Sequence, residues 1–446
     1  MRETRVAQIS IFEFYSEHEQ GQQLKRLSEL LDQSPDVLTM IAQDFQQKPA
    51  CLGGCAGLSI ESILRCLILK QLLQVSYKQL AFHLSDSLSY RSFARLAGTV
   101  SPSRSSLQSL IRQVSPNTLK NIFQYFIQHW HKQNLVSIDQ LRIDSTVIAS
   151  NIAPPSDSQL LNDGVRVLSR LLAKSNEGVG LKIRFTDQRK TSKSLAFRIF
   201  NSKKAEKEQL YPKLLQVVNI VVKQVDRALL QVESDAKAAA IGAHWCSKLL
   251  HYKGLLCQVV DQTKRRVIEK ENVPSSEKLV SLFEPHTDVI VKGFRDVQFG
   301  HKVNVATATG GFITGFTLEK GNPSDKELFL PMLDEHQERY GALPKRTIAD
   351  GGYASQTNVR AGREKGVHAV AFHKPVGIGL HEMGLKKKTL TKLRHFRAGV
   401  EGNISELKRA FGATKAQWKG EDGFTAFVWA SVMTYNLMHW VRLKPT

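Results

Sequence analysis

The order of strand and helix patterns in the second half of the chain constrains its fold more than any other feature. An alternating, β-branched pattern at LVSIDQLRIDSTVIAS (135–150) predicts a first strand. Strand patterns resume only at TDVIVK (287–292), HKVNVATAT (301–309) and GFITGFTLEKG (311–321), with a hairpin signal at Gly310 and Gly311. Helix and strand patterns then alternate, in the order KELFLPMLDEHQERYG (326–341), TIAD (347–350), SQTNVRAGREKG (355–366), HAVAFHK (368–374) and FRAGVEGNISELKRAFG (396–412).

Without residues 153–280, which read mainly as helix, three strands are followed by helix, strand, helix, strand and helix. We therefore predict an α/β fold with a mixed five-stranded sheet and flanking helices, interrupted by a mainly helical insertion after the first strand. Residues 22–132 have apolar residues at helical spacing and Ser at N-cap positions, which predicts an all-helical N-terminal domain. The predicted domains are 1–134 and 135–446, with the insertion at about 153–280.

Charge limits the class of partner. The 446 residues carry a formal net charge of +21, which favours a polyanion and makes nucleic acid the first choice. A membrane surface is the competing partner, but no apolar run is long and uninterrupted enough to span a bilayer. The closest, FTAFVWASVMTYNLMHW (424–440), contains polar residues and predicts a buried core helix. The N-terminus has acids where a signal peptide would be apolar, so we expect a cytoplasmic protein.

The helix pattern at 396–412 carries an unusual set of charges. At 100° per residue, Arg397, Glu401 and Lys408 fall within about 40° of one another, whereas Glu406 points the opposite way. Beside them runs an apolar stripe formed by Val400, Ile404, Leu407 and Phe411. The helix can therefore bury its apolar edge and present a cation, a carboxylate and a second cation along that border.

Three carboxylates could converge at one edge of the predicted sheet. Asp144 lies in the first strand and Asp350 ends the fourth; these strands can be neighbours, with the helix that carries Glu401 beside them. Such a cluster needs cations, and hard oxygen ligands suit Mg²⁺ or Mn²⁺. Two such ions about 4 Å apart would clamp the attacking and leaving oxygens of a phosphoryl displacement.

Each acid also has an ordinary explanation. Asp144 could satisfy backbone donors, Asp350 could open a tight turn with the two glycines that follow, and Glu401 could be a solvated helix residue. Other acids compete with them: Asp157, Asp163, Asp288 and Asp325. Of these, Asp325 is better explained as a cap of the helix that follows it.

These residues resemble those of a known family, the DDE transposases of bacterial insertion sequences. In that family the catalytic domain is RNase H-like and the third acid lies in a signature of Tyr, two residues, Arg, three residues, Glu, six residues and Lys. Arg397, Glu401 and Lys408 fit this spacing, and Arg394 stands where the Tyr would be. RIDST (142–146) and IADGGY (348–353) are similar to the first two acidic motifs, and VWASVMTYNLMHW (428–440) to the terminal helix.

The resemblance implies a function and a site. Asp144, Asp350 and Glu401 would be catalytic and would bind two Mg²⁺ ions, with Mn²⁺ as a substitute. Water would hydrolyse a phosphodiester bond at each end of the insertion sequence (the element), and the freed 3′-OH would then attack target DNA. The partners would be double-stranded DNA, as terminal inverted repeats and as target, and a second copy in a homodimer, with no membrane. The protein would act in the bacterial cytoplasm, at the nucleoid when bound to DNA.

Basic residues extend the predicted DNA contact on both sides of the third acid. The residues expected to touch DNA are Arg397, Lys408, Arg394, Lys392, Lys386, Lys387, Lys388 and Arg104. Arg104 would open a helix of helix-turn-helix type, although a capped surface helix explains it equally well. The charge run around 386–394 could also be plain solvated charge. A weaker second candidate lies in the insertion and comprises Arg189, Lys190, Lys193, Arg198, Lys203 and Lys204.

Two other functions remain open at this point. One is a catalytically decayed relative that binds DNA without cutting it, and the other is an RNase H-like nuclease without strand transfer. The complete set of three acids favours an enzyme over the decayed relative. The cations beside Glu401 favour a protein that grips a transposon end over a simple nuclease.

Overall fold

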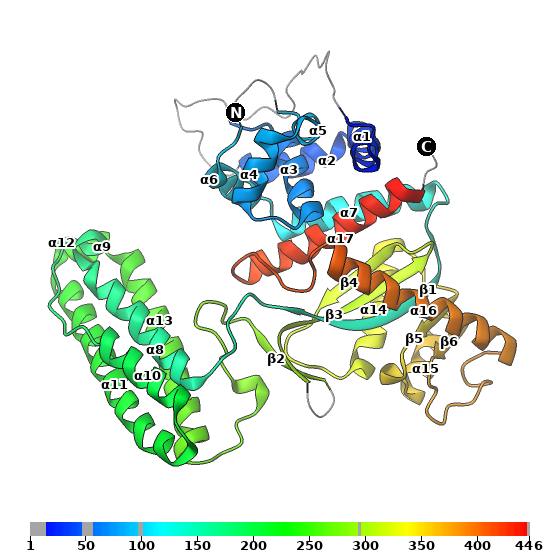
Figure 1. The fold of residues 1–446 in the computed structure, drawn as a ribbon. Coiled ribbons are helices and arrows are strands. Elements are labelled where there is room, and N and C mark those ends of the chain that lie inside the picture. Colours follow the sequence, from blue (N-terminus) through cyan, green and yellow to red (C-terminus); the bar gives the residue numbers. More distant parts are fainter. Residues whose placement is uncertain (1–14, 47–56, 97–100, 293–295, 444–446) are drawn as a thin grey trace. The chain divides into compact units, whose positions relative to one another are not determined.

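The computed structural model describes residues 15–46, 57–96, 101–292 and 296–443 (Figure 1). The chain divides into two compact units. Unit 1 comprises Met1–Ala149 together with Lys302–Thr446, and unit 2 comprises Ser150–His301. Unit 2 is therefore an insertion in the sequence of unit 1. The boundaries predicted for the domains, 134/135 and about 153–280, stay predictions.

The first part of unit 1 is helical, as the sequence predicts. Its helices are α1 (Glu19–Asp32), α2 (Asp36–Gln46), α3 (Ile60–Leu73), α4 (Tyr77–Asp86), α5 (Leu88–Phe93), α6 (Arg104–Ile111) and α7 (Pro116–Lys132). Serine hydroxyls accept from backbone N–H groups at the starts of α3 to α7, which satisfies donors that a helix leaves unpaired.

The last helix, α17 (Glu421–Leu443), packs against α1, α3 and α7, and Figure 1 shows it in red beside α7. Its side chains are buried along most of its length, so the predicted core helix is confirmed. Among the described residues, every helix is too short or too polar to cross a membrane.

The central sheet is mixed. Its strands in unit 1 are β1 (Ser137–Ala149), the second part of β3 (Asp296–Thr309), β4 (Ile313–Leu318), β5 (Arg346–Ala349) and β6 (Ala369–Phe372). Neighbours follow the order β3, β1, β5, β6; β1, β5 and β6 are parallel, and β4 is antiparallel to β3. The hairpin between β3 and β4 is confirmed, since Gly310 and Gly311 there have φ values of 90° and 88°, which favour glycine.

The predicted number of strands was wrong. The described residues form six strands in this sheet, not five, because TDVIVK gives a separate strand, β2 (Asp288–Lys292). β2 pairs in antiparallel register with Asp296–Gly300 of β3, which precede the boundary between the units. The sequence has a strand pattern at each of these six places, so the error lies in the count of three strands before the alternating helices and not in the patterns.

Helices cover both faces of the sheet in unit 1. Besides α7 and α17, the helices of this part are α14 (Asp325–Tyr340), the 3₁₀ turn η3 (Gly351–Tyr353), α15 (Gln356–Glu364) and α16 (Lys387–Ala410). Alternate residues of a strand serve opposite faces. Ile143 of β1 lies in an apolar core with α14 and α15, whereas Ile148 lies in a second core with α7 and α17. The two faces of β1 thus face different helices.

Unit 2 is mainly helical and has its own core. It contains α8 (Asp157–Ala173), α9 (Ser175–Val179), α10 (Arg189–Asn201), α11 (Lys204–Ser234), α12 (Ala236–Ile241), α13 (Ala243–Thr263), the π-helical η1 (Lys264–Ile268), η2 (Ser275–Glu277) and β2. Helix α8 packs against α10, α11 and α13. Figure 1 shows these four helices, in green, as an elongated bundle.

Candidate active site

Asp144 and Asp350 lie at matching positions along two adjacent parallel strands, β1 and β5. The last aligned pair of β1 and β5 is Ile143 and Ala349. Asp144 is the next residue of β1 and Asp350 directly follows β5, so they lie side by side at the carboxyl end of β5. Asp350 then opens η3, where Gly352 permits a close approach, since a Cβ there would lie 2.9 Å from an Asp325 oxygen.

Helix α16 brings the third acid to the same place through Arg397. Nη2 of Arg397 lies 3.2 Å from Asp144 Oδ2 and 3.3 Å from Asp350 Oδ1, and its Nη1 donates to Glu401 Oε1 at 2.8 Å. The Arg397 side chain is only 8% exposed, whereas Asp350 and Glu401 are 45% and 63% exposed. One buried guanidinium is therefore shared by the three predicted carboxylates.

Arg142 fixes α16 against β1. Its side chain is buried and donates to Thr307 Oγ1 (2.6 Å) on β3 and, on α16, to Phe396 O (2.7 Å) and Asn403 Oδ1 (2.6 Å). These bonds use all the guanidinium nitrogens, which gives the contact a defined geometry. Arg142 is two residues before Asp144, so the same strand carries the first acid and the residue that positions the helix of the third.

The environment of Asp144 opposes its ionisation. Burial raises the pKa of its carboxyl, and the neighbouring Asp350 and Glu401 raise it further. Arg397 and the backbone N–H of Ser145, which donates to Asp144 Oδ1 at 2.8 Å, act in the opposite direction. The three acids thus need positive charge, and Arg397 supplies it in this structure.

The donor set fits a hard divalent cation. Asp144, Asp350 and Glu401 offer six carboxylate oxygens, the ligand type that Mg²⁺ and Mn²⁺ prefer. As they stand, these side chains surround the Arg397 guanidinium, and within the described part of the chain no three His, Cys, Asp or Glu side chains form a ready-made metal cage. Their role as metal ligands stays a prediction.

The competing acids have other partners. Asp157 and Asp163, in unit 2, pair with Arg266 and Arg166, and Asp288 pairs with His301. Glu406 pairs with Arg442 of α17, as expected for a residue on the opposite side of α16 from Glu401. The apolar edge of α16 is also as predicted, with Val400, Leu407 and Phe411 buried.

Family comparisons now decide the class of protein. A family model described as Transposase DDE domain matches residues 292–437, which include Asp350, Arg397 and Glu401. A second, described as Transposase domain (DUF772), matches residues 12–113. This chain belongs to the DDE transposases of insertion sequences. No curated protein and no solved structure matches it. Neither family match reaches Asp144 of this transposase or the helices of unit 2.

The basic residues predicted to contact DNA lie mostly along α16. Lys386 precedes the helix, Lys387 and Lys388 begin it, and they are exposed, as is Lys392. Cations at a helix N-terminus oppose the helix dipole, so this placement favours an anionic partner over stability. Arg394 is half-buried and donates to His373 O, and Lys408 lies in the last turn. Arg104 is exposed at the first position of α6 of the transposase.

The interpretation of Asp325 as a helix cap was wrong. Ser324 is the N-cap residue of α14, and Asp325 is the first residue of the helix. Its Oδ1 accepts from Ser145 Oγ at 3.1 Å and lies 2.6 Å from Lys302 Nζ. Since Ser145 also binds Asp144 through its backbone, Asp325 and Lys302 belong to the surroundings of the site.

Sequence reasoning did not assign three residues to this site: Arg142, Lys302 and Asp325, the last of which it explained as a helix cap. The first two are cations buried within strands, at 7% and 6% exposure. A cation inside a strand pattern is a signal, because charged residues are rarely buried without partners. The partners themselves are far away in sequence and could not be read from it.

Proposed function

We propose that this transposase cleaves phosphodiester bonds at the ends of its insertion sequence and joins the freed ends to target DNA. The observation that carries the proposal is the convergence of Asp144, Asp350 and Glu401 on Arg397 at one edge of the sheet. A family-wide dependence on divalent metal and the hard oxygen donors of this site support the use of Mg²⁺, with Mn²⁺ as a substitute.

The proposed roles follow from the chemistry of each side chain. Asp144, Asp350 and Glu401 hold two metal ions, which, when bound, stabilise the negative charge that develops on the phosphate oxygens. Arg397, Lys408 and the cations at the start of α16 hold the phosphates of the element end. In the first step a water oxygen forms the new bond to phosphorus and a 3′-OH leaves. In the second, that 3′-OH attacks a target phosphate and displaces a target 3′-oxygen.

The partners proposed are double-stranded DNA, as terminal inverted repeats and as target, and a second copy of the chain. A dimer would hold two element ends for joining to one target. The net charge of +21 supports a polyanionic partner. The proposed place of action is the bacterial cytoplasm, at the nucleoid.

Strand transfer is the test, because it separates this function from simple nuclease activity. The full-length protein is incubated with Mg²⁺, a plasmid target and labelled duplexes covering the DNA on either side of the gene. The expected product is the label joined covalently to the plasmid. Cleaved duplex without joining would indicate a nuclease, and binding without cleavage would indicate a decayed relative.

A matched pair of variants on β1 assigns the activity to the site. Asp144→Asn is expected to abolish cleavage and joining. Asp139→Asn, at an exposed residue of the same strand that pairs with Lys345, is expected to leave both unchanged. If Asp144→Asn cleaves and joins DNA as well as Asp139→Asn does, Asp144 is not one of the catalytic acids.

A further inference from the structure

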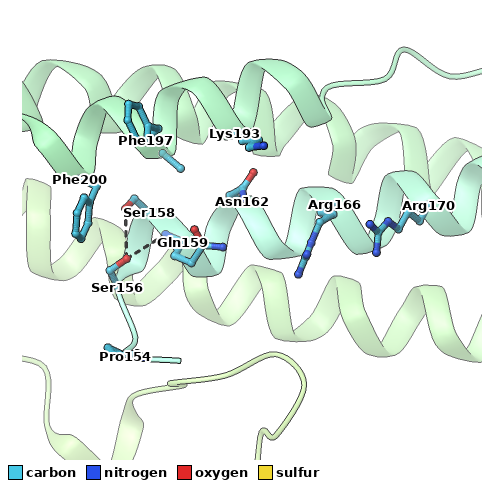
Figure 2. A pocket seen from close by; sticks show the side chains of 11 residues that line it. Pro154, Ser156, Ser158, Gln159, Asn162, Arg166, Arg170, Lys193, Phe197 and Phe200 are labelled. Carbon is cyan, nitrogen blue, oxygen red and sulfur yellow. Dashed lines mark hydrogen bonds between the residues drawn. The ribbon is translucent and has the colours of Figure 1, made fainter. Parts of the chain in front are cut away.

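A groove between α8 and α10 of unit 2 carries two facing rows of side chains (Figure 2). On α8 the row is Asn162, Arg166 and Arg170, spaced four residues apart, and on α10 it is Lys193, Phe197 and Phe200. Residues at these spacings lie on one face of a helix. The groove has a volume of about 550 Å³, within the range of about 300–1,000 Å³ typical of ligand sites.

The two aromatic rings of the groove are exposed. Phe197 and Phe200 are 69% and 74% exposed, although they lie one turn apart on a helix whose other apolar residues are buried (Ala196 and Ile199) or half-buried (Leu195). Single exposed apolar residues are common, but adjacent exposed rings beside a groove indicate a surface that another molecule covers.

The charge of the groove is positive. Among the described residues that line it, none is Asp or Glu, and three are cations: Arg166, Arg170 and Lys193. Arg166 is already held by Asp163 at 2.7 Å and lies over the ring of Phe283. The net positive charge therefore comes from Arg170 and Lys193, both exposed.

The two helices that form the groove are bonded to each other. Ser192 Oγ donates to Asn162 Oδ1 at 3.0 Å in a buried contact between α10 and α8. Ser156 caps α8 at the end of the groove near Phe200, as Figure 2 shows. The rings and cations thus stand on two helices whose relative position is fixed by the packing within unit 2.

We propose that this groove binds a single-stranded segment of DNA, with phosphates at Arg170 and Lys193 and unpaired bases against Phe197 and Phe200. Proteins commonly hold a single strand by stacking its bases on aromatic side chains and binding its phosphates with cations. In a duplex the faces of the bases are already covered by their neighbours. The proposal rests on the proposed function, in which DNA is the partner, and it assigns a DNA contact to a part of the chain that neither family match reaches.

Binding of a fluorescein-labelled 20-nucleotide single strand to the full-length protein tests the groove. Phe197→Ala/Phe200→Ala is expected to weaken binding by about 5- to 150-fold per base lost from a ring, with the salt dependence unchanged. Arg170→Gln/Lys193→Gln is expected to reduce the slope of log K against log salt by about 1.4, since each phosphate contact to a single strand contributes about 0.7.

Matched controls come from the other helices of unit 2. Lys223→Gln/Arg227→Gln removes two exposed cations from α11, and Leu230→Ala/Leu250→Ala shortens two exposed apolar residues of α11 and α13. Both control pairs are expected to bind as the wild type does. Photocrosslinking of a 5-iodouracil strand is expected to map to Phe197 and Phe200.

Three outcomes would overturn the inference. The groove variants could bind and crosslink like the wild type. They could bind DNA normally but lose self-association in sedimentation velocity, which would make a second copy of the chain the occupant. The wild type could also fail to bind the single strand while it cleaves and joins duplex ends, and the proposed function would then stand without the groove.

Discussion

Nη2 of Arg397 lies 3.2 Å from Oδ2 of Asp144, so a residue of α16 contacts a residue of β1 that lies 253 positions earlier in the sequence. The same nitrogen reaches Asp350, and the other terminal nitrogen reaches Glu401. Arg397 therefore balances the three carboxylates that we propose as metal ligands.

Replacement of Arg397 tests this balance. Arg397→Gln is expected to lower the free energy of unfolding by about 1–3 kcal/mol, because charged hydrogen bonds are lost and the acids repel one another. Mn²⁺ is expected to raise the melting temperature of the variant more than that of the wild type, since the cation no longer competes with the guanidinium. Differential scanning calorimetry with and without Mn²⁺ measures both effects. Equal metal shifts in the two proteins would contradict the account.

Two glycines of α16 give a matched test of how the helix is positioned. A Cβ on Gly399 would lie 2.0 Å from Arg142 Nη1, whereas one on Gly402 would meet nothing within 4 Å. Gly399→Ala is expected to cost about 1–3 kcal/mol and to slow cleavage, because it displaces the side chain that ties α16 to β1. Gly402→Ala is expected to stabilise the helix by about 0.5–1 kcal/mol.

Chemical denaturation and cleavage rates of these two variants provide the measurement. Gly402 directly follows Glu401, so its variant also controls for any effect of an added methyl group close to the site. A Gly399→Ala protein as stable and as active as Gly402→Ala would show that Arg142 does not set the position of α16.

Asp325 and Lys302 are expected to depend on each other. Asp325→Asn alone leaves the ammonium of the buried Lys302 side chain without its carboxylate and should cost about 3 kcal/mol. Adding Lys302→Met should recover much of that loss, because the unpaired charge is removed as well. A double-mutant cycle by urea denaturation measures the coupling. Strictly additive losses would mean that the two residues act independently.

Much of the fold could be predicted because local patterns determine it. The serine caps of α3 to α7, the Gly310 and Gly311 turn and the buried face of α16 all depend on residues close in sequence. The proximity of Asp144 and Asp350 was predicted only as a possibility. It required β1 and β5 to be neighbours, and strand order depends on contacts between distant segments.

The missed features share one physical cause, which is pairing between distant residues. Arg142 finds its partners on β3 and α16, and Asp325 finds Ser145 on β1, so neither could be read from its own neighbourhood. The apolar stripes of the N-terminal helices likewise do not specify their partners. In the structure, α1 to α7 contribute to the same core as β3, β4 and α17.

The most direct test of the central claim compares two glutamates of one helix. Cleavage of labelled duplexes carrying the element end is measured in Mg²⁺ and in Mn²⁺ for the wild type, Glu401→Gln and Glu406→Gln. Glu406 pairs with Arg442 on the other side of α16, and the loss of this exposed pair should cost no more than about 1 kcal/mol. We predict that Glu401→Gln binds DNA without cutting it and that Glu406→Gln cuts normally. If Glu401→Gln cuts as the wild type does, the three-carboxylate site is contradicted.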